Sequence, residues 1–285
     1  MLCVVGTVPD PDFPLALGPA AMESGRIVVD GRKVPVNRGT PALLGAALSA
    51  ADVLGLPAVH ACLVGDIGRG DGSRRLYAHL ERHLADAPWT VLVFHYLQPD
   101  VDWHNRVLFA AETIRPRPVM IADAGFMYAA KMSGQAPAYD LFTPDAGELA
   151  FLADETAPHP FYTRGFILHE EARVPELIAR AYAHENAART LLVKGEKDVL
   201  ADERGVIETV AEPKSATMEA MGGTGDTLTG LASALTASGR DVARAAILAA
   251  RVNRLAGRLA DPTPATPVEA LIRHIPRALR QMLEG

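Results

Sequence analysis

The chain has 285 residues, of which 49% are hydrophobic and 22% charged, the composition of a globular protein with a full hydrophobic core. Its 28 Lys and Arg against 34 Asp and Glu give a net charge of −6, and the scattered acids argue against a nucleic-acid or anionic-membrane surface. Cys3 and Cys62 are too few for a disulfide framework, and their separation does not match the ligand spacing of a metal site.

The N-terminal sequence MLCVVGTVPDPDFP lacks a basic region followed by a long apolar run, so we expect no signal peptide. No window of about 18 uninterrupted apolar residues occurs, so we expect no membrane span. We therefore expect a cytoplasmic protein that binds neither nucleic acid nor membrane. We also expect it to form a homo-oligomer.

Short runs typical of strands alternate with longer Ala- and Leu-rich stretches of helical period. In chain order, the predicted strands are Leu2–Gly6, Arg26–Asp30, Val59–Val64, Thr90–His95, Val119–Asp123, Asp140–Thr143 and Thr190–Lys194. The predicted helices between them are Pro41–Leu54, Arg74–Leu84, Trp103–Thr113, Ala146–Ala153 and Glu171–His184. Continuously apolar runs such as VLVF and VMIA are typical of strands covered on both faces, and their alternation with helices predicts a mainly parallel sheet.

The C-terminal part of the chain changes character. A hairpin is predicted over Lys194–Val210, with its turn at Asp202–Gly205. Three helices follow, at Thr227–Ser238, Asp241–Ala260 and Val268–Leu283. The sequence therefore predicts an α/β protein built as one three-layer α/β/α domain over residues 1–285.

In an open parallel sheet, ligands bind beyond the carboxyl ends of the strands. The residues at these ends are Gly6-Thr7, Gly65-Asp66, His95-Tyr96, Asp123-Ala124-Gly125, Thr143-Pro144-Asp145 and Lys194-Gly195. His95 and Asp123 either line a substrate pocket there or are buried polar residues with hydrogen-bond partners.

The glycine cluster Met221–Gly230, MGGTGDTLTG, runs directly into a predicted helix. Glycines let backbone N–H groups converge, and a helix N-terminus adds partial positive charge, so the segment suits a phosphate. Asp226 within it has the chemistry of a general base that takes a proton from a substrate hydroxyl during phosphoryl transfer. The alternative is an N-cap aspartate beside glycines needed for packing.

The segment TPDAGE follows a strand and opens a helix, which brings Asp145 and Glu148 to one helix face. Such a pair can hold hydrated Mg²⁺ that accompanies nucleotide phosphates, or it can form a capping box. Lys194, followed by Gly195, ends an apolar strand and can neutralise phosphate charge. The alternative is a lysine that merely extends to solvent.

Four motifs follow one another along the chain: IADAG (Ile121–Gly125), LFTPDAGELAFLA (Leu141–Ala153), LLVKGEKDVLAD (Leu191–Asp202) and AMGGTGDTLTGLASAL (Ala220–Leu235). Together they resemble the ribokinase-like superfamily, and specifically its branch of ADP- or ATP-dependent NAD(P)H-hydrate dehydratases. The tail sequence AARVNRLAGRLA also looks like that family. The stretch RGTPALLGAALSAADVLGLP (Arg38–Pro57) looks like its helix beside the substrate pocket.

The resemblance implies an activity: a nucleotide-dependent dehydratase phosphorylates the hydroxyl of a hydrated nicotinamide cofactor, phosphate leaves, and NAD(P)H is restored. It implies ADP or ATP and Mg²⁺ as cofactors, with Asp226 as the catalytic base. The anion hole and nucleotide site would comprise Gly222, Gly223, Thr224, Gly225, Lys194, Gly195 and Asn253. The metal would be held by Glu148 and Asp145, and the substrate pocket would include Asp123, Gly39, Thr40 and His95.

Three features depart from the dehydratase pattern. Asp145 stands where these enzymes usually carry His, the segment His95–Asp100 replaces a GPGLG-type loop, and LVGD (Leu63–Asp66) is more similar to the VGxDxxG stretch of related kinases. The alternative function is therefore an ATP-dependent kinase of a small alcohol, such as a sugar or vitamin precursor. A third hypothesis is a nucleotide-binding sensor without turnover.

Two further segments carry alternatives of their own. The glycines at 68, 70 and 72 do not have GxGxxG spacing and predict a plain loop rather than a dinucleotide site. The segment Ala157–Phe166, APHPFYTRGF, is either a lid over the ligand or an ordinary surface loop.

Overall fold

The central sheet brings the ends of its parallel strands, which precede the polar motifs, to one edge. The structure, a computed structural model, describes residues 1–155, 173–215, 217–218 and 221–284. These residues form an 11-stranded sheet in the order β11-β10-β9-β8-β7-β6-β1-β5-β2-β3-β4. Its central strands are parallel: β5 (His60–Gly65), β1 (Leu2–Val8), β6 (Val91–His95), β7 (Val119–Asp123), β8 (Leu141–Phe142) and β9 (Thr190–Val193).

Antiparallel strands extend the sheet at both edges. On one side lie β2 (Ala16–Glu23), β3 (Arg26–Val29) and β4 (Arg32–Pro35). On the other side lie β10 (Asp198–Asp202) and β11 (Gly205–Val210), which form the predicted hairpin. The predicted α/β class with a mainly parallel central sheet is confirmed.

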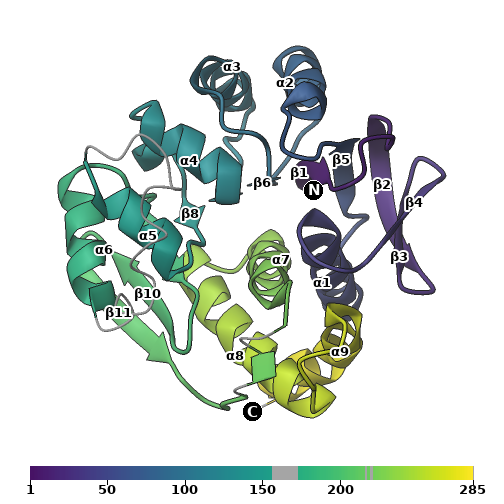
Figure 1. Cartoon of the computed structure of the whole chain (residues 1–285), viewed down its shortest axis with the longest axis vertical. Coiled ribbons are helices and arrows are strands. Elements are labelled where there is room, and N and C mark those ends of the chain that lie inside the picture. The colour runs from purple at the N-terminus through teal and green to yellow at the C-terminus, as the bar shows by residue number, and fades with distance from the viewer. Residues whose placement is uncertain (156–172, 216, 219–220, 285) are drawn as a thin grey trace.

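Helices cover both faces of the sheet (Figure 1). One layer contains α1 (Thr40–Leu54), α7 (Thr224–Ala237), α8 (Val242–Ala260) and α9 (Val268–Glu284). The other contains α2 (Asp71–His83), α3 (Val101–Glu112), α4 (Ala124–Met132), α5 (Ala146–Ala153) and α6 (Val174–Ala183). The described residues also form the short 3₁₀ helices η1 (Leu84–Asp86) and η2 (Ala136–Ala138).

The strand side chains alternate between two hydrophobic cores. In β1, Leu2 and Val4 belong to the core under α1 and α7, whereas Cys3 and Val5 belong to the core on the opposite face. Because neighbouring side chains of a strand point to opposite faces, a strand covered on both faces must be apolar throughout. This is why the runs VLVF and VMIA show no alternation of polar and apolar residues.

Some elements differ from their predictions. The sequence ALGPAAME of β2 contains Gly18 and Pro19 and has no β-branched residue, so its strand signal is weak; pairing with β5 holds it. The helix α4 begins directly after Asp123, which caps it through a hydrogen bond from the Ala124 N–H. The predicted lid Ala157–Phe166 lies outside the described residues.

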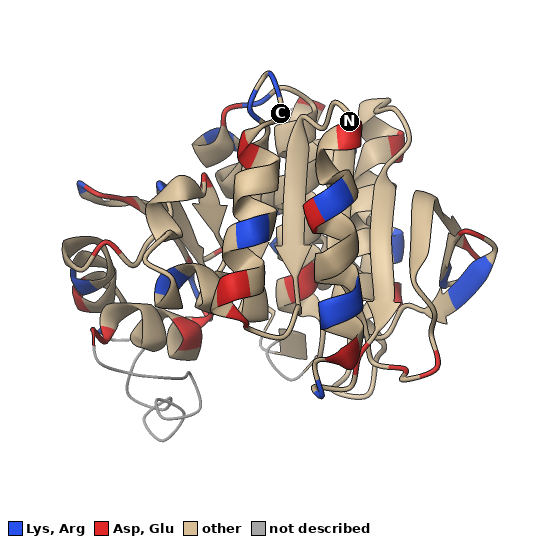
Figure 2. Cartoon of the chain, turned by 90° about the horizontal axis from the view of Figure 1, so that it is seen from above, with Lys and Arg blue, Asp and Glu red and all other residues tan. Residues whose placement is uncertain are grey.

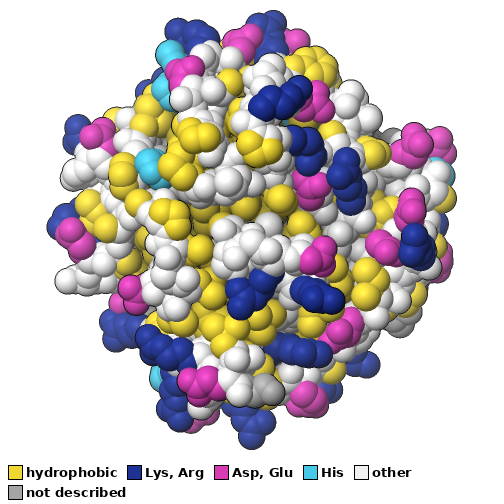
Figure 3. Space-filling view, turned by 180° about the vertical axis from the view of Figure 1, so that it is seen from behind, with side chains coloured by type: hydrophobic (Ala, Val, Ile, Leu, Met, Phe, Trp, Pro, Cys, Tyr) yellow, Lys and Arg dark blue, Asp and Glu magenta, His cyan; other side chains and the backbone are white. Residues whose placement is uncertain are grey.

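The surface carries both signs of charge. Lys and Arg alternate with Asp and Glu along the helices in Figure 2, and on the face seen in Figure 3 they are interspersed with hydrophobic side chains. Among the helices of the described residues, none combines the length and hydropathy needed to cross a bilayer.

Candidate active site

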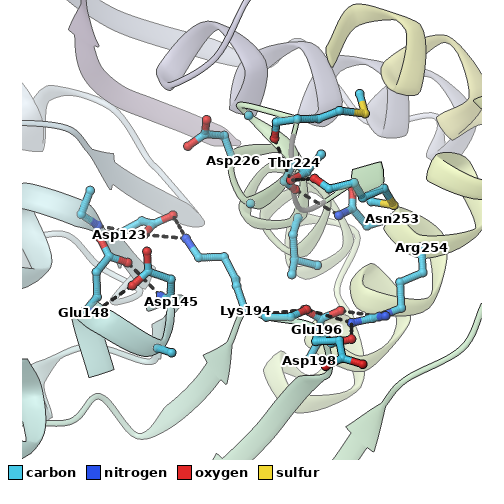
Figure 4. Close-up of a pocket in the computed structure, with 18 of the residues that line it drawn as sticks. Asp123, Asp145, Glu148, Lys194, Glu196, Asp198, Thr224, Asp226, Asn253 and Arg254 are labelled. Carbon is cyan, nitrogen blue, oxygen red and sulfur yellow. Dashed lines mark hydrogen bonds and ion pairs between the residues drawn. The ribbon is translucent and has the colours of Figure 1, made fainter. Parts of the chain in front are cut away.

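A cavity of about 780 Å³ lies at the carboxyl ends of the parallel strands. His95 ends β6 and Asp123 ends β7 as its partner in register, while Lys194 directly follows β9. Residues of the glycine cluster at the start of α7, from Gly223 to Asp226, also line the cavity. The rule that ligands bind beyond the carboxyl ends of parallel strands therefore brings together residues that are far apart in the sequence (Figure 4).

The glycine cluster gives α7 an open N-terminus. The N-cap Gly223 has φ 99°, a conformation that favours glycine, and no side chain caps the helix. The Thr224 hydroxyl binds the carbonyls of Met218 and Met221, each at 3.3 Å, which fixes the first turn. The unpaired N–H groups of a helix start and its positive dipole end suit a phosphate.

Asp226 lies in this first turn and is held through both carboxylate oxygens. Its Oδ2 accepts a hydrogen bond of 2.6 Å from the Gly39 N–H, and its Oδ1 lies 3.2 Å from Nε2 of His95. Burial raises the pKa of Asp226, but the His95 ring, the charge of Lys194 and the Gly39 N–H outweigh it and bring the pKa below its usual value. Asp226 is therefore an ionised carboxylate, as a general base must be.

Lys194 is engaged by Asp123. Its Nζ lies 3.0 and 2.9 Å from the two oxygens of that carboxylate, which also accepts a bond from the Thr229 hydroxyl. Burial lowers the pKa of Lys194, yet the charges of Asp123 and Glu148 overcome this and raise it. The lysine stem passes within 3.3 Å of the Cβ position of Gly225, so the charged group remains beside the glycine cluster.

Asp145 and Glu148 form the capping box that the sequence left as an alternative. The Asp145 carboxylate accepts from the Glu148 N–H at 2.7 Å, and Glu148 accepts from the Asp145 N–H at 2.9 Å. The Tyr128 hydroxyl donates to Glu148 at 2.5 Å. Burial raises the pKa of Glu148 to about 8; Lys194 opposes this shift, and the carboxylates of Asp145 and Asp123 add to it.

The carboxylates of Asp145 and Glu148 are the groups expected to bind Mg²⁺. No group of three His, Cys, Asp or Glu side chains able to hold a metal occurs in the part of the chain that the structure describes. Mg²⁺ at nucleotide sites takes only one or two carboxylates and completes its shell with water and phosphate. Asp145 and Glu148, which line the cavity together with Lys194 and Lys214, fit that kind of ion.

Asn253 and Arg254 shape the cavity from α8. The Asn253 amide accepts from the Thr227 hydroxyl at 2.7 Å and donates to the Thr224 carbonyl at 3.0 Å, so it braces the start of α7. Arg254 was not singled out from the sequence. It pairs with Asp198 at 2.7 Å and donates to the carbonyls of Gly195 and Glu196, which fixes the loop after Lys194; its only sequence signal is its place in the motif AARVNRLAGRLA.

Two residues expected in the substrate pocket, Thr40 and Gly39, contact other site residues instead of lining the cavity. Thr40 is fully buried and bonds His95 rather than facing the cavity, whereas Gly39 caps α1 and bonds Asp226. Tyr96, which the sequence did not place among the site residues, lines the cavity with φ 54° and a side chain that is 52% exposed.

Asp66, in the stretch similar to kinases, has a local structural role. Its carboxylate accepts from the N–H groups of Gly68, Arg69, Gly70 and Ser73 and from the Ser73 hydroxyl. These bonds hold the loop before α2, where Gly68 and Gly70 lie as predicted, whereas Gly72 lies in the first turn of α2. This departure from the dehydratase pattern therefore has an explanation that does not involve substrate.

Comparison with solved structures defines the class of fold. The chain is similar to a ribokinase-like superfamily protein of Enterococcus faecalis, with a TM-score of 0.58 and 15% identity over 99% of this chain and 87% of the other. It is also similar to the ADP/ATP-dependent NAD(P)H-hydrate dehydratase of Bacillus subtilis, with a TM-score of 0.59 and 15% identity over 99% and 89%. A pyridoxal kinase of Staphylococcus aureus gives 0.53 and 13% over 89% and 86%. The fold is ribokinase-like.

The family is defined by sequence. Residues 98–277 match the family described as NAD(P)H-hydrate dehydratase, and the chain belongs to that family. An uncharacterized protein of Methanocaldococcus jannaschii is 38% identical over 243 residues, which are 85% of this chain and 100% of that protein. The ADP-dependent (S)-NAD(P)H-hydrate dehydratase of Cenarchaeum symbiosum is 33% identical over 120 residues, 42% of this chain and 37% of that enzyme. The family predicted from the motifs is confirmed.

Proposed function

We propose that the protein dehydrates hydrated NAD(P)H at the expense of ADP or ATP. The observation that carries this proposal is the ionised Asp226, held at the uncapped start of α7 beside Lys194. A base next to an anion site is the arrangement that phosphoryl transfer to a hydroxyl needs. The membership of residues 98–277 in the dehydratase family supports hydrated NAD(P)H as the acceptor.

The reaction balances in two steps. The substrate hydroxyl loses its proton to Asp226 while its oxygen forms a bond to the terminal phosphorus of the nucleotide, and the bond from that phosphorus to the leaving nucleotide breaks. Phosphate then departs with the electron pair of the C–O bond, and the neighbouring carbon loses a proton to solvent, which restores the ring double bond. Phosphorylation helps because hydroxide is a poor leaving group and phosphate a good one.

The chain's own residues bind and orient the reactants. The N–H groups at the start of α7 would hold the transferring phosphoryl group, and Lys194 would offset its charge. Asp145 and Glu148 would hold Mg²⁺, which when bound neutralises charge on the nucleotide phosphates. Arg254, through its bonds to the carbonyls after Lys194, would keep the nucleotide side of the cavity in shape.

A kinase of a small alcohol is the second candidate. The cavity residues His95 and Tyr96, and Gly39, which bonds Asp226, all precede residue 98, where the family match begins. The residues that would choose the acceptor are therefore those the family match does not include. The same base and anion site serve a kinase, in which the phosphorylated alcohol is released as product.

The test follows NADH absorbance after hydrated NADH is mixed with the protein, Mg²⁺ and either ADP or ATP. Recovery of absorbance that requires the nucleotide supports the dehydratase. With an active reference dehydratase alongside, no recovery with either nucleotide contradicts it. Consumption of ATP with small alcohols would then support the kinase, and nucleotide binding without any product would support the sensor.

A further inference from the structure

His95 is completely buried at the end of β6, between three polar neighbours. Its Nδ1 lies 3.0 Å from the Thr40 hydroxyl, and its Nε2 lies 3.2 Å from Asp226 and 3.8 Å from Asp123. Among the described side chains, Nε2 of His95 is the buried polar atom that lacks a partner in hydrogen-bond geometry. The contact with Asp226 is therefore close but out of line.

The neighbours of the ring determine which nitrogen carries a proton. Two carboxylate oxygens face Nε2, so a bare lone pair there would be repelled by negative charge, whereas an N–H is attracted. In the neutral ring, Nδ1 then accepts from the Thr40 hydroxyl; in the cationic ring, Nδ1 donates to it. In either state Nε2 carries an N–H, which lies close to the two carboxylates without the alignment of a hydrogen bond.

The fold makes room for this arrangement at Gly6. A Cβ on Gly6 would lie 2.5 Å from the Thr40 hydroxyl and 2.6 Å from the His95 carbonyl, so a side chain there would displace α1 or β6. Gly39, at the start of α1, supplies the second contact to Asp226. The partners of Asp226 thus come from the part of the chain before residue 98, outside the family match.

We infer that His95 is a positioning residue for Asp226, which keeps that carboxylate ionised and oriented toward the substrate hydroxyl, with Thr40 fixing the ring. The inference rests on the proposed function only in taking Asp226 as the base, and it holds for either acceptor. His95 acts through Asp226, because its Nε2 is itself inaccessible to substrate.

The effect of removing His95 has a definite sign. Burial acts to raise the pKa of Asp226, and the His95 ring is the first of the groups that oppose it. Without the ring, Lys194 and the Gly39 N–H remain, and the pKa of Asp226 moves upward. Of the described residues, Asp226 on α7 and Asp123 at the end of β7 lie against the ring, and the ring of Tyr96 contacts it edge-on. Lys194, directly after β9, is paired with Asp123.

The decisive experiment measures the pKa of Asp226 directly, by carboxyl carbon NMR of the full chain. We compare wild type with His95→Leu, which removes the donor, and His95→Gln, whose amide can replace the N–H. We expect the pKa to rise by about one unit or more in His95→Leu and to stay near wild type in His95→Gln. An unchanged pKa in His95→Leu overturns the inference, and this readout does not depend on knowing the substrate.

Kinetics provide the second readout. The acid limb of kcat/KM should move to higher pH in His95→Leu, kcat at neutral pH should fall about 10- to 100-fold, and nucleotide Kd should stay unchanged. Thr40→Val keeps the ring but frees it to turn, and should shift the acid limb in the same direction by less; it also replaces His95→Leu as the test if that variant does not fold. Equal losses in His95→Leu and His95→Gln, without any shift of the acid limb, would assign His95 to packing alone.

Discussion

The ammonium group of Lys194 lies between both carboxylate oxygens of Asp123, at 3.0 and 2.9 Å, and so ties the end of β9 to the end of β7 across the short strand β8. The Asp123 side chain is 2% exposed and that of Lys194 13%. An ion pair so deeply buried costs much when one partner is removed, because the other charge stays behind unpaired.

Lys194→Met should therefore lower the free energy of unfolding by about 3–5 kcal/mol. The double variant Asp123→Asn/Lys194→Met should recover part of that loss, because no buried charge is left unpaired. Nucleotide affinity should fall in both, since both lack the cation beside Gly225. Urea unfolding and nucleotide titration of the variants measure the two effects separately. If the double variant is no more stable than Lys194→Met, the loss does not come from an unpaired charge.

The raised pKa of Glu148 should make the stability of the protein depend on pH. Its pKa of about 8 in the folded protein exceeds the ordinary value for Glu, so between about pH 4.3 and pH 8 the folded state keeps a proton that the unfolded state has lost. Stability should therefore fall as pH rises through this window. In Glu148→Gln the fall should be smaller, whereas the exposed Glu112→Gln should behave like wild type.

Mg²⁺ should act on the same group. Because the ion binds the ionised carboxylate, it should raise the Tm of wild type more at pH 8 than at pH 5, and it should raise that of Glu148→Gln less. Thermal melts with and without Mg²⁺ at the two pH values measure this. Equal stabilisation of both proteins at both pH values would contradict the assignment of Glu148 to the metal.

Replacing Tyr96 should weaken binding of the phosphate acceptor rather than binding of the nucleotide. Its exposed ring lines the cavity, and its Cδ2 lies 3.8 Å from the Cβ position of Gly39, beside Asp226. Tyr96→Ala should raise KM for the acceptor about tenfold, the equivalent of losing one aromatic contact. Tyr96→Phe should remain near wild type. A change in nucleotide Kd without a change in acceptor KM would show that the Tyr96 ring contacts the nucleotide and not the acceptor.

The glycines of the α7 motif differ in how much space surrounds them. A Cβ on Gly230 would lie 2.2 Å from the Leu43 carbonyl, because α7 packs closely on α1, whereas the nearest atom to a Cβ on Gly222 is Arg38 Cδ at 3.9 Å. Gly230→Ala should thus lower the free energy of unfolding by about 1–3 kcal/mol. Gly222→Ala should leave it nearly unchanged. Chemical unfolding of this pair tests the distinction, and equal stability of the two variants would refute it.

Features that depend on neighbouring residues could be predicted from the sequence, whereas features that depend on contacts between distant segments could not. The apolar strands carry a local signal, and the ligand-binding edge of a parallel sheet follows from them, so the strand-end residues Asp123 and Lys194 are predicted at that edge. Asp226 is assigned to the same site through its glycine motif and the family resemblance. The strand β2 could not be predicted, because its pairing with β5 rather than its own residues holds it.

The same reasoning explains what was missed in the site. The resemblance places Thr40 in the substrate pocket; that its hydroxyl bonds His95 is revealed only by the three-dimensional contact between α1 and β6. Arg254 has no signal beyond its motif, because its partner Asp198 and the carbonyls it binds lie on another element. For Asp145 and Glu148, the sequence supported both a metal pair and a capping box, and the backbone bonds of the second are present.

The most direct test of the central claim is the rate of NADH recovery from hydrated NADH by Asp226→Asn, measured with nucleotide and Mg²⁺ at saturating concentrations. Asn fits the same space but cannot accept the proton of the substrate hydroxyl. The account predicts a loss of at least about 100-fold in kcat, with nucleotide Kd retained because the start of α7 is intact. Wild-type turnover in Asp226→Asn would contradict Asp226 as the base.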